Sequence, residues 1–329
     1  MSNACKLVSL FAVLCLVGGC TTYPGDPAPP RVGDEIVVAG EFFHTGTPVV
    51  LWIDKGGYDA YRVEKRFAPR GQHNWSAFKD HFDTPNRYGT RGERSMSEAE
   101  FERHRHGQWT LDELRERVDL FVMHYDVCGT SRRCFDILHD HRCLSVHFMV
   151  DVDGTVYQTL DLKERAWHAG SANDRSIGIE IANIGAYPPA EADAVFEQWY
   201  EPTPQGAKLK LSAQERRALR NPGFVGYSAR PGRVTGQIHG RELVMHDLTP
   251  QQYDALAKLS ASLSRIFPKL TLDVPRDPDG RVLNRVLTED ELADFSGLIG
   301  HYHLTTGKID PGPAFDWDRV AEEAAGHLP

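Results

Sequence analysis

The sequence predicts an α/β fold in which a mixed central β-sheet is flanked by helices. Apolar segments of strand length alternate along the chain with segments that carry helix-start signals. Elements in this order bury their apolar faces most readily as a sheet covered by helices. Two long stretches lie outside the pattern, and we expect an N-terminal extension at 33–118 and an insertion at about 187–246.

The predicted strands begin close to the N-terminus. The segments 35–44 (EIVVAGEFFH) and 49–54 (VVLWID) flank a Gly-Thr-Pro turn, and we expect one strand in each. A third strand is expected at 119–124. Apolar residues alternate around Asp153-Gly154 in LSVHFMVDVDGTVYQTL, which predicts a hairpin. The isoleucine-rich segment SIGIEIANIG, 176–185, predicts another strand.

Capping boxes indicate where helices begin, because a side-chain oxygen and a Glu or Gln three residues later satisfy free backbone N–H groups. The boxes are Thr110-x-x-Glu113, Ser212-x-x-Glu215, Thr249-x-x-Gln252 and Thr288-x-x-Glu291. Apolar residues keep helical spacing from Tyr253 to Phe267, so the third of these helices should pack on the sheet. The polar stretch 69–107 is expected to be irregular.

The N-terminus has the features of an export signal. Lys6 precedes an apolar run at 7–17, which is too short for a comfortable membrane span, and Gly18-Gly19-Cys20 follows. This ending resembles a bacterial lipobox, so we expect a signal peptide at 1–19 and lipidation of Cys20. The alternative is an ordinary signal with an incidental cysteine. The Pro-rich residues 20–32 are expected to form a tether.

Composition restricts the function. Hydrophobic residues make up 41% and charged residues 25% of the 329 residues, as in ordinary globular proteins. The net charge of −9 argues against nucleic-acid binding, because phosphate backbones attract basic surfaces.

Three cysteines remain after the predicted processing, namely Cys128, Cys134 and Cys143. An exported protein meets an oxidising compartment, where cysteines pair. We expect a Cys128–Cys134 disulfide across the short loop, with Cys134–Cys143 as the alternative. Their spacing fits no standard thiolate zinc cluster.

Five residues form a chemical set although they lie far apart in the chain. His124 ends an apolar strand, Glu180 lies inside another, His301 follows GLIG, and Lys308 and Asp310 precede a Pro-Gly turn. A catalytic zinc takes three protein ligands and leaves one position for water. Two histidines and an aspartate could supply those ligands, a glutamate could move protons, and a lysine could stabilise an oxyanion.

Each residue also has an ordinary structural explanation. A histidine after a strand is more often structural than a ligand, and an aspartate before Pro-Gly usually forms a turn. Glu180 on an apolar strand is more informative, because burying an unpaired carboxylate is costly. A structural salt bridge is the alternative for Glu180.

A family resemblance connects these residues. The motifs VMHYD, LSVHFMVDVDGTVYQ, ERAWHAG, NDRSIGIEIAN, GHYH and K-x-DPGPAFDW occur in this order. Together they resemble the zinc N-acetylmuramoyl-L-alanine amidases, a family that includes the peptidoglycan recognition proteins. The resemblance covers roughly 119–185 and 248–317, and implies an amidase domain at 119–329 with a fold of this type.

The resemblance also assigns roles to individual residues. It implies Zn²⁺ as the cofactor, with His124, His301 and Asp310 as its ligands. It implies that Glu180 is the general base and Lys308 the cation. In the recognition-protein branch a Tyr precedes the hairpin histidine, whereas here that residue is Val146, which supports Glu180.

Further implied residues concern the substrate and the cysteines. His168 and Asn173 are expected to line a glycopeptide groove, and Trp167 either stacks there or belongs to the core. The Cys128-x5-Cys134 spacing resembles a small disulfide of the recognition proteins.

The implied activity is hydrolysis of the amide bond between N-acetylmuramic acid and L-alanine. The partner would be peptidoglycan or its fragments, either intact murein or anhydro-muropeptides. We expect a monomer, exported and anchored through Cys20 to the periplasmic face of the bacterial outer membrane, with the inner membrane as the alternative. A non-catalytic peptidoglycan-binding module and a zinc peptidase are the alternative functions.

Overall fold

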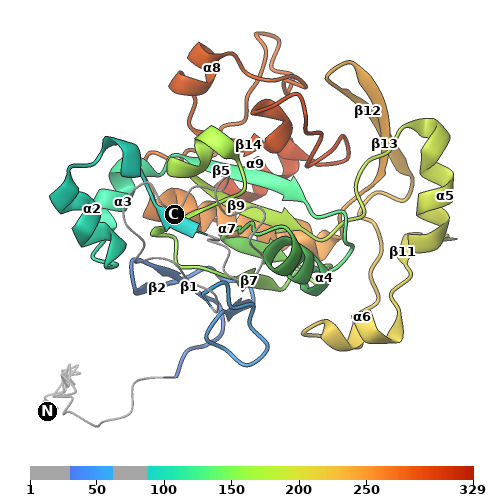
Figure 1. The fold of residues 1–329 in the computed structure, drawn as a ribbon. Helices are drawn as coiled ribbons and strands as arrows, with labels where there is room; N and C mark the ends of the chain where they lie inside the picture. Colours follow the sequence, from blue (N-terminus) through green and yellow to red (C-terminus); the bar gives the residue numbers. More distant parts are fainter. Residues whose placement is uncertain (1–29, 62–87) are drawn as a thin grey trace, which may run out of the picture. The chain divides into compact units, whose positions relative to one another are not determined.

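A six-stranded mixed sheet forms the centre of the computed structural model, which describes residues 30–61 and 88–329 (Figure 1). The strand order is β14-β5-β9-β6-β7-β3, and every neighbouring pair except β6–β7 is parallel. The strands are β3 (Val49–Leu51), β5 (Leu120–Tyr125), β6 (Phe148–Val150), β7 (Val156–Gln158), β9 (Ser176–Ile181) and β14 (Gly297–Gly300). The predicted mixed sheet is confirmed. The predicted signal peptide, Cys20 and most of the tether lie outside the described residues.

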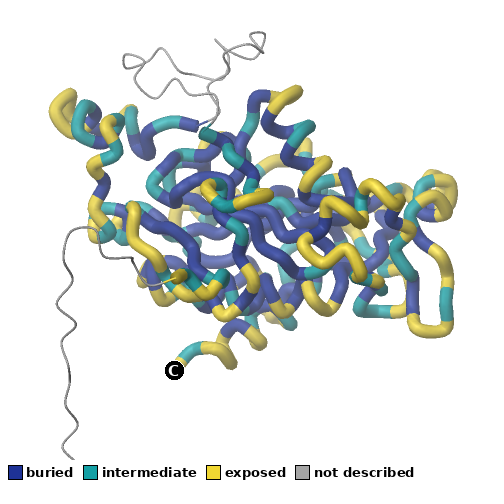
Figure 2. Tube along the Cα trace, turned by 90° about the horizontal axis from the view of Figure 1, so that it is seen from below, coloured by how far each residue is buried: buried dark blue, intermediate teal, exposed yellow. Residues whose placement is uncertain are grey.

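Helices cover both faces of this sheet, as predicted. Helix α7 (Pro250–Ile266) begins at the predicted capping box and packs its apolar side chains into the main core on one face. Helix α4 (Ser131–Phe135) and the π-helical turn η2 (Asp136–His141) contribute to a second core with Met149 and Tyr157. Figure 2 shows that the buried backbone is concentrated in the central strands between these layers.

Alternation along β5 and β9 decides which side chains reach which face, because successive side chains of a strand point to opposite sides. The residues that join the α7 core are Phe121, Met123 and Tyr125 of β5 and Ile177, Ile179 and Ile181 of β9. His124 and Glu180 lie between them in sequence, and they are register partners in the parallel pair. Both side chains therefore lie on the face opposite α7.

The segment 35–44 was predicted to form one strand, but it forms a hairpin. Strands β1 (Glu35–Val38) and β2 (Glu41–His44) pair antiparallel around Ala39 and Gly40. Both turn residues have positive φ, 52° and 83°, which reverses the chain within two residues. The second predicted strand is confirmed as β3, which joins the central sheet beside β7.

The rest of the N-terminal extension is more regular than expected. Helix α2 (Glu98–Arg105) lies in the stretch expected to be irregular, and its capping box, Ser97 with Glu100, was overlooked in the sequence. The turn η1 (Glu93–Ser95) precedes it, and helix α3 (Leu111–Arg117) follows the predicted box at Thr110. Strand β4 (Tyr88–Thr90) pairs with β8 (Glu164–Ala166). Residues 62–87 lie outside the described residues, and 32–329 belong to one compact unit.

The insertion at about 187–246 forms its own small core beside the sheet (Figure 1). The predicted helix at Ser212 is confirmed, whereas the other helix and the two hairpins were not predicted. Its elements are α5 (Pro189–Trp199), β10 (Tyr200–Thr203), β11 (Gly206–Leu209), α6 (Ala213–Ala218), β12 (Arg233–Ile238) and β13 (Arg241–His246).

Short elements complete the described chain. They are η3 (Gly170–Asp174), α8 (Glu289–Asp294), η4 (His301–His303) and α9 (Trp317–Gly326). Helix α8 begins at the predicted capping box of Thr288, and α9 packs along α7. Within residues 30–61 and 88–329, none of the helices has the length and apolar character needed to cross a membrane.

The turn of the β6–β7 hairpin gives a stability prediction. A Cβ atom at Gly154 (φ +80°) would lie 2.6 Å from the Gln251 carbonyl oxygen in the first turn of α7. Gly154→Ala should therefore lower the free energy of unfolding by about 2–4 kcal/mol, through positive φ and the clash together. Urea unfolding followed by circular dichroism measures this.

Gly280→Ala is the matched control, because Gly280 has φ +82° and a Cβ atom added there would have nothing within 4 Å. It should cost only about 1–2 kcal/mol, since it carries the backbone penalty alone. Equal losses in both variants would refute the proposed close approach of the hairpin to α7.

Candidate metal centre

Three neighbouring segments bring the predicted metal ligands together. His124 lies near the end of β5, and the adjacent parallel strand β14 ends at Gly300, directly before His301. The backbone N–H of Tyr302 donates to the carbonyl oxygen of Asp310, which returns Asp310 to the same end of the sheet. His124, His301 and Asp310 are all buried. The fold thus joins residues that are 177 and 186 positions apart in the chain.

The contacts within this triad form a triangle with equal sides. The Nδ1 atoms of His124 and His301 lie 2.9 Å apart, and each lies 2.9 Å from Oδ2 of Asp310. If both nitrogens carried protons for Asp310, the two N–H groups would also face each other. A cation bound by three lone pairs removes this conflict. The donor set and its spacing therefore fit a zinc ion, whose bonds to nitrogen and oxygen are about 2.0–2.2 Å long.

His168 makes the contact that orients the first ligand. Its Nδ1 lies 3.0 Å from Nε2 of His124, and its Nε2 lies 3.3 Å from the Ser176 hydroxyl. A proton on Nε2 of His124 would leave the Nδ1 lone pair directed to the triad, the arrangement usual for metal-binding histidines. Gly178 makes room for this ring, since a Cβ there would lie 2.5 Å from Nδ1 of His168.

The protonation states suit metal binding, which requires neutral imidazoles and an ionised carboxylate. Burial and the neighbouring His301 lower the pKa of His124 to about 4. Burial alone would raise the pKa of Asp310, but its hydrogen bonds with His124 and His301 outweigh this effect and lower it. At neutral pH His124 is neutral and Asp310 is charged.

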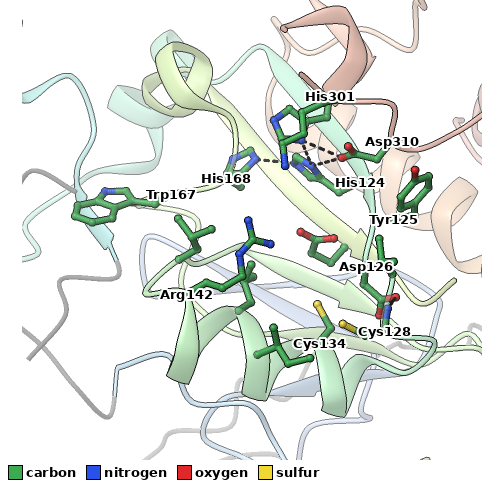
Figure 3. A pocket seen from close by; sticks show the side chains of 16 residues that line it. His124, Tyr125, Asp126, Cys128, Cys134, Arg142, Trp167, His168, His301 and Asp310 are labelled. Atoms are coloured by element: carbon green, nitrogen blue, oxygen red, sulfur yellow. Dashed lines mark hydrogen bonds and ion pairs between the residues drawn. The ribbon is translucent and has the colours of Figure 1, made fainter. Parts of the chain in front are cut away.

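The triad opens into a cavity of about 120 Å³ whose walls carry further ionisable groups (Figure 3). Besides the triad, the lining includes Arg142, Trp167, His168, Glu180 and Lys308. Burial raises the pKa of Glu180 well above its usual range, and the charge of Asp310 raises it further. Lys308 and Arg142 act in the opposite direction. Among the described residues no group donates a hydrogen bond to the Glu180 carboxylate, so its oxygens are available to a ligand.

Arg142 is a member of this cavity that the sequence did not reveal. It follows η2 in a loop that belongs to none of the recognised motifs. In Figure 3 its guanidinium group extends into the cavity from the side of α4 and η2. Together with Lys308 it supplies two cations on walls that come from different parts of the chain.

The predicted substrate-binding residues fall into two groups. Trp167 and His168 line the cavity. Asn173 does not, so its expected place in the groove is corrected. The Asn173 side-chain oxygen accepts hydrogen bonds from the backbone N–H groups of His168 and Ala169, and it therefore holds the loop that carries His168.

Cys128, Cys134 and Cys143 are free and buried in this structure, so the expected Cys128–Cys134 disulfide is not formed in it and stays a prediction. Cys128 and Cys134 nevertheless lie together in the cavity wall (Figure 3). A hydrogen bond between their thiols lowers the pKa of Cys128 and raises that of Cys134.

Arg91 is a second residue that the sequence did not single out. Its guanidinium group is completely buried and donates to the backbone carbonyls of Leu162, Asn173 and Ser176. These carbonyls flank the loop that carries His168. A buried charge is costly unless it is well satisfied, and here backbone dipoles take the place of a carboxylate. The N-terminal extension thus fixes one wall of the cavity.

Comparison with known proteins agrees with the family resemblance of the sequence motifs. Residues 114–212 match the family model for N-acetylmuramoyl-L-alanine amidase. The match contains His124, His168 and Glu180, and it ends before His301 and Asp310. No curated protein matches the chain.

Solved structures show distant similarity. The N-acetylmuramyl-L-alanine amidase AmiD from E. coli, solved with anhydro-N-acetylmuramic acid-L-Ala-D-gamma-Glu-L-Lys, has 19% identity and a TM-score of 0.36. That alignment covers 63% of this chain and 57% of AmiD, so the chain spans less than two thirds of AmiD. AmpD has 19% identity and a TM-score of 0.31, over 64% of this chain and 86% of AmpD. The endolysin LysCS from Clostridium intestinale has 16% identity and a TM-score of 0.34, over 66% of this chain and 88% of LysCS.

The triad predicts the zinc affinity of single variants. The wild-type chain should bind one Zn²⁺ at this site. Asp310→Ala should weaken binding by at least about 100-fold, and His168→Ala by about 10–100-fold, because His168 only orients a ligand. Competition with a chromogenic chelator at pH 7.5 measures both.

His141→Ala is the control, because His141 is exposed and does not line the cavity. Its zinc affinity should equal that of the wild type. Wild-type affinity in Asp310→Ala would exclude the triad as the metal centre.

Proposed function

We propose that this chain is a zinc-dependent peptidoglycan amidase, because its residues 114–212 match the family model for N-acetylmuramoyl-L-alanine amidase. The bond cleaved is the amide between the lactyl group of N-acetylmuramic acid and L-alanine, in peptidoglycan or its fragments. The observation that carries the proposal is the convergence of His124, His301 and Asp310 beside Glu180 in one cavity.

His124, His301 and Asp310 would hold the ion. When bound, zinc supplies Lewis-acid polarisation of a carbonyl group and makes a water molecule acidic near neutral pH. The buried triad supports this assignment, because it offers two imidazole nitrogens and one carboxylate oxygen within 2.9 Å of one another.

Glu180 is the proposed general base. It lies in register with His124 on the neighbouring strand, and its oxygens accept no hydrogen bond from the described residues. A carboxylate with a raised pKa takes a proton from the attacking water more readily than an ordinary one. The protonated Glu180 then gives that proton to the amide nitrogen, so that the C–N bond breaks and L-alanine leaves as a neutral amine.

Lys308 and Arg142 are the proposed oxyanion partners. Attack on the amide places negative charge on the former carbonyl oxygen, and cations that line the cavity stabilise that charge. Both side chains line the cavity and both act electrostatically on Glu180. Trp167 and His168, on the opposite wall, are proposed to contact the sugar and peptide of the substrate.

We further propose that the chain is exported and held at the periplasmic face of the outer membrane as a monomer, through a lipid on Cys20. The sequence around Gly18-Gly19-Cys20 supports this. Cys20→Ser should move the protein from the membrane fraction to the soluble periplasmic fraction, because the lipid supplies the only proposed anchor. Fractionation and mass spectrometry of the N-terminal peptide measure this. An unmodified N-terminal peptide in the wild type would refute it.

Glu180→Gln tests the catalytic proposal. The amide keeps the size of the side chain but cannot take up the proton, so turnover should fall by about 10²–10⁴-fold. Zinc stoichiometry should stay unchanged, since Glu180 is not a proposed ligand. Mass spectrometry of digested muropeptides should show a new lactyl carboxylate and free L-alanine amino ends in the wild type.

Glu242→Gln, at an exposed position of β13, is the control and should retain full activity. Full activity in Glu180→Gln would remove Glu180 from the mechanism. Other new amino ends in the wild-type digest would indicate a peptidase, and retention on murein without any product would indicate a binding module.

A further inference from the structure

The insertion contains a second cavity, separate in its lining from the metal centre. Its volume is about 240 Å³, and it lies between α5, the β10–β11 hairpin and the β12–β13 hairpin. Its lining includes the buried residues Phe196, Tyr200, Ala207 and His246 and the exposed residues Pro202 and Pro231. Several of these side chains belong to the small core of the insertion, so the wall is firmly packed.

Two polar groups in this wall have no partner among the residues that the structure describes. His246 is 7% exposed, its Nδ1 is buried, and neither ring nitrogen takes part in a hydrogen bond. The Tyr200 hydroxyl also has no hydrogen bond, and Tyr200 is 5% exposed. The two rings lie 4.2 Å apart between centroids. Of these atoms only Nδ1 of His246 is fully enclosed, whereas Nε2 of His246 and the Tyr200 hydroxyl keep some solvent exposure. Polar atoms of largely buried side chains are normally satisfied, so this pair points to a ligand that bonds the two accessible atoms.

The protonation of these groups determines what they can recognise. Burial, together with the charge of Arg233, lowers the pKa of His246 to about 4. Burial also raises the pKa of Tyr200 far above neutrality. At neutral pH the wall therefore presents one neutral imidazole, with one donor and one acceptor nitrogen, and one neutral hydroxyl.

The rim of the cavity favours an uncharged ligand. Arg233 is already paired with Asp193, and its guanidinium carbon lies 5.1 Å from the centre of the Phe196 ring. Glu197 adds a negative charge on the same rim. The carboxylates of a peptide stem would be repelled by Glu197, and no unpaired cation among the described lining residues would offset this repulsion. A neutral sugar would not be repelled.

We propose that this cavity binds an N-acetylated sugar ring of the glycan strand. The acetamido N–H donates to the acceptor nitrogen of His246, and the acetamido carbonyl accepts from the Tyr200 hydroxyl. The methyl group and the apolar face of the ring pack against Ala207 and the aromatic wall. This site rests on the proposed function, because it assumes a peptidoglycan substrate, and it adds a glycan subsite away from the scissile bond.

The wall of this cavity is connected to the metal centre through covalent and hydrogen-bonded neighbours. The Asn183 side-chain amide donates to the carbonyl of His246, and the Asn183 backbone N–H donates to Asp126 in the lining of the catalytic cavity. A sugar bound beside His246 would therefore lie next to a residue that is hydrogen-bonded to Asp126, two positions after His124.

The test uses the zinc-loaded full chain and triacetylchitotriose, a sugar without lactyl or peptide groups that an amidase cannot cleave. Isothermal titration calorimetry should detect binding to the wild type. Tyr200→Phe and His246→Phe should each weaken binding by about 3–10-fold, and the double variant by more than about 10-fold, because each removes one hydrogen bond.

Tyr187→Phe is the matched control. Tyr187 packs in the same small core, its hydroxyl donates to the Ile184 carbonyl, and it does not line the cavity. Its affinity should stay within about two-fold of the wild type. Glu180→Gln should bind the sugar normally while losing cleavage, so failure of the subsite and failure of the amidase proposal can be told apart.

Several results would overturn the subsite. They are the absence of wild-type binding at millimolar sugar, equal binding by the wild type and the Tyr200 and His246 variants, or Tyr200-dependent binding of the peptide L-Ala-D-γ-Glu-L-Lys in place of the sugar.

Discussion

The parallel pairing of β5 with β9 is the constraint on which the site depends. This register sets His124 opposite Glu180 and directs both away from the α7 core. A shift of β9 by one residue would bury Glu180 in that core and turn Ile179 or Ile181 toward the cavity. The run of isoleucines on the other face prevents the shift, because it would lose its contacts with α7. Hydrophobic packing on one face therefore fixes the chemistry on the other.

The N-terminal extension and the insertion contact the segments on either side of this strand pair. Arg91 of the N-terminal extension fixes the loop of His168 from one side. From the other side, His239 at the tip of the β12–β13 hairpin lies 3.0 Å from the carbonyl oxygen of Lys308. The extension and the insertion thus both contact segments that carry cavity residues, although neither supplies a member of the triad.

The sequence predicted the elements whose signals are local. Capping boxes located α3, α6, α7 and α8, and Asp153-Gly154 located the β6–β7 hairpin. The metal triad was predicted through motifs. The sequence did not predict the roles of Arg91 and Arg142 or the burial of Asn173, because these depend on contacts between distant segments. The Cys128–Cys134 pairing was predicted from the short loop, the expected export and the family resemblance, and none of these fixes the oxidation state of the two thiols.

The distance in sequence between His124 and His301 has a thermodynamic consequence. An ion shared by these residues closes a loop of just over half the chain, and it binds only when β5 and β14 are already adjacent. Its binding free energy would therefore add to the free energy of unfolding, and it would link the C-terminal third to the sheet. Metal supply would then control the lifetime of the folded chain as well as its chemistry, and starvation for zinc would expose the protein to proteolysis.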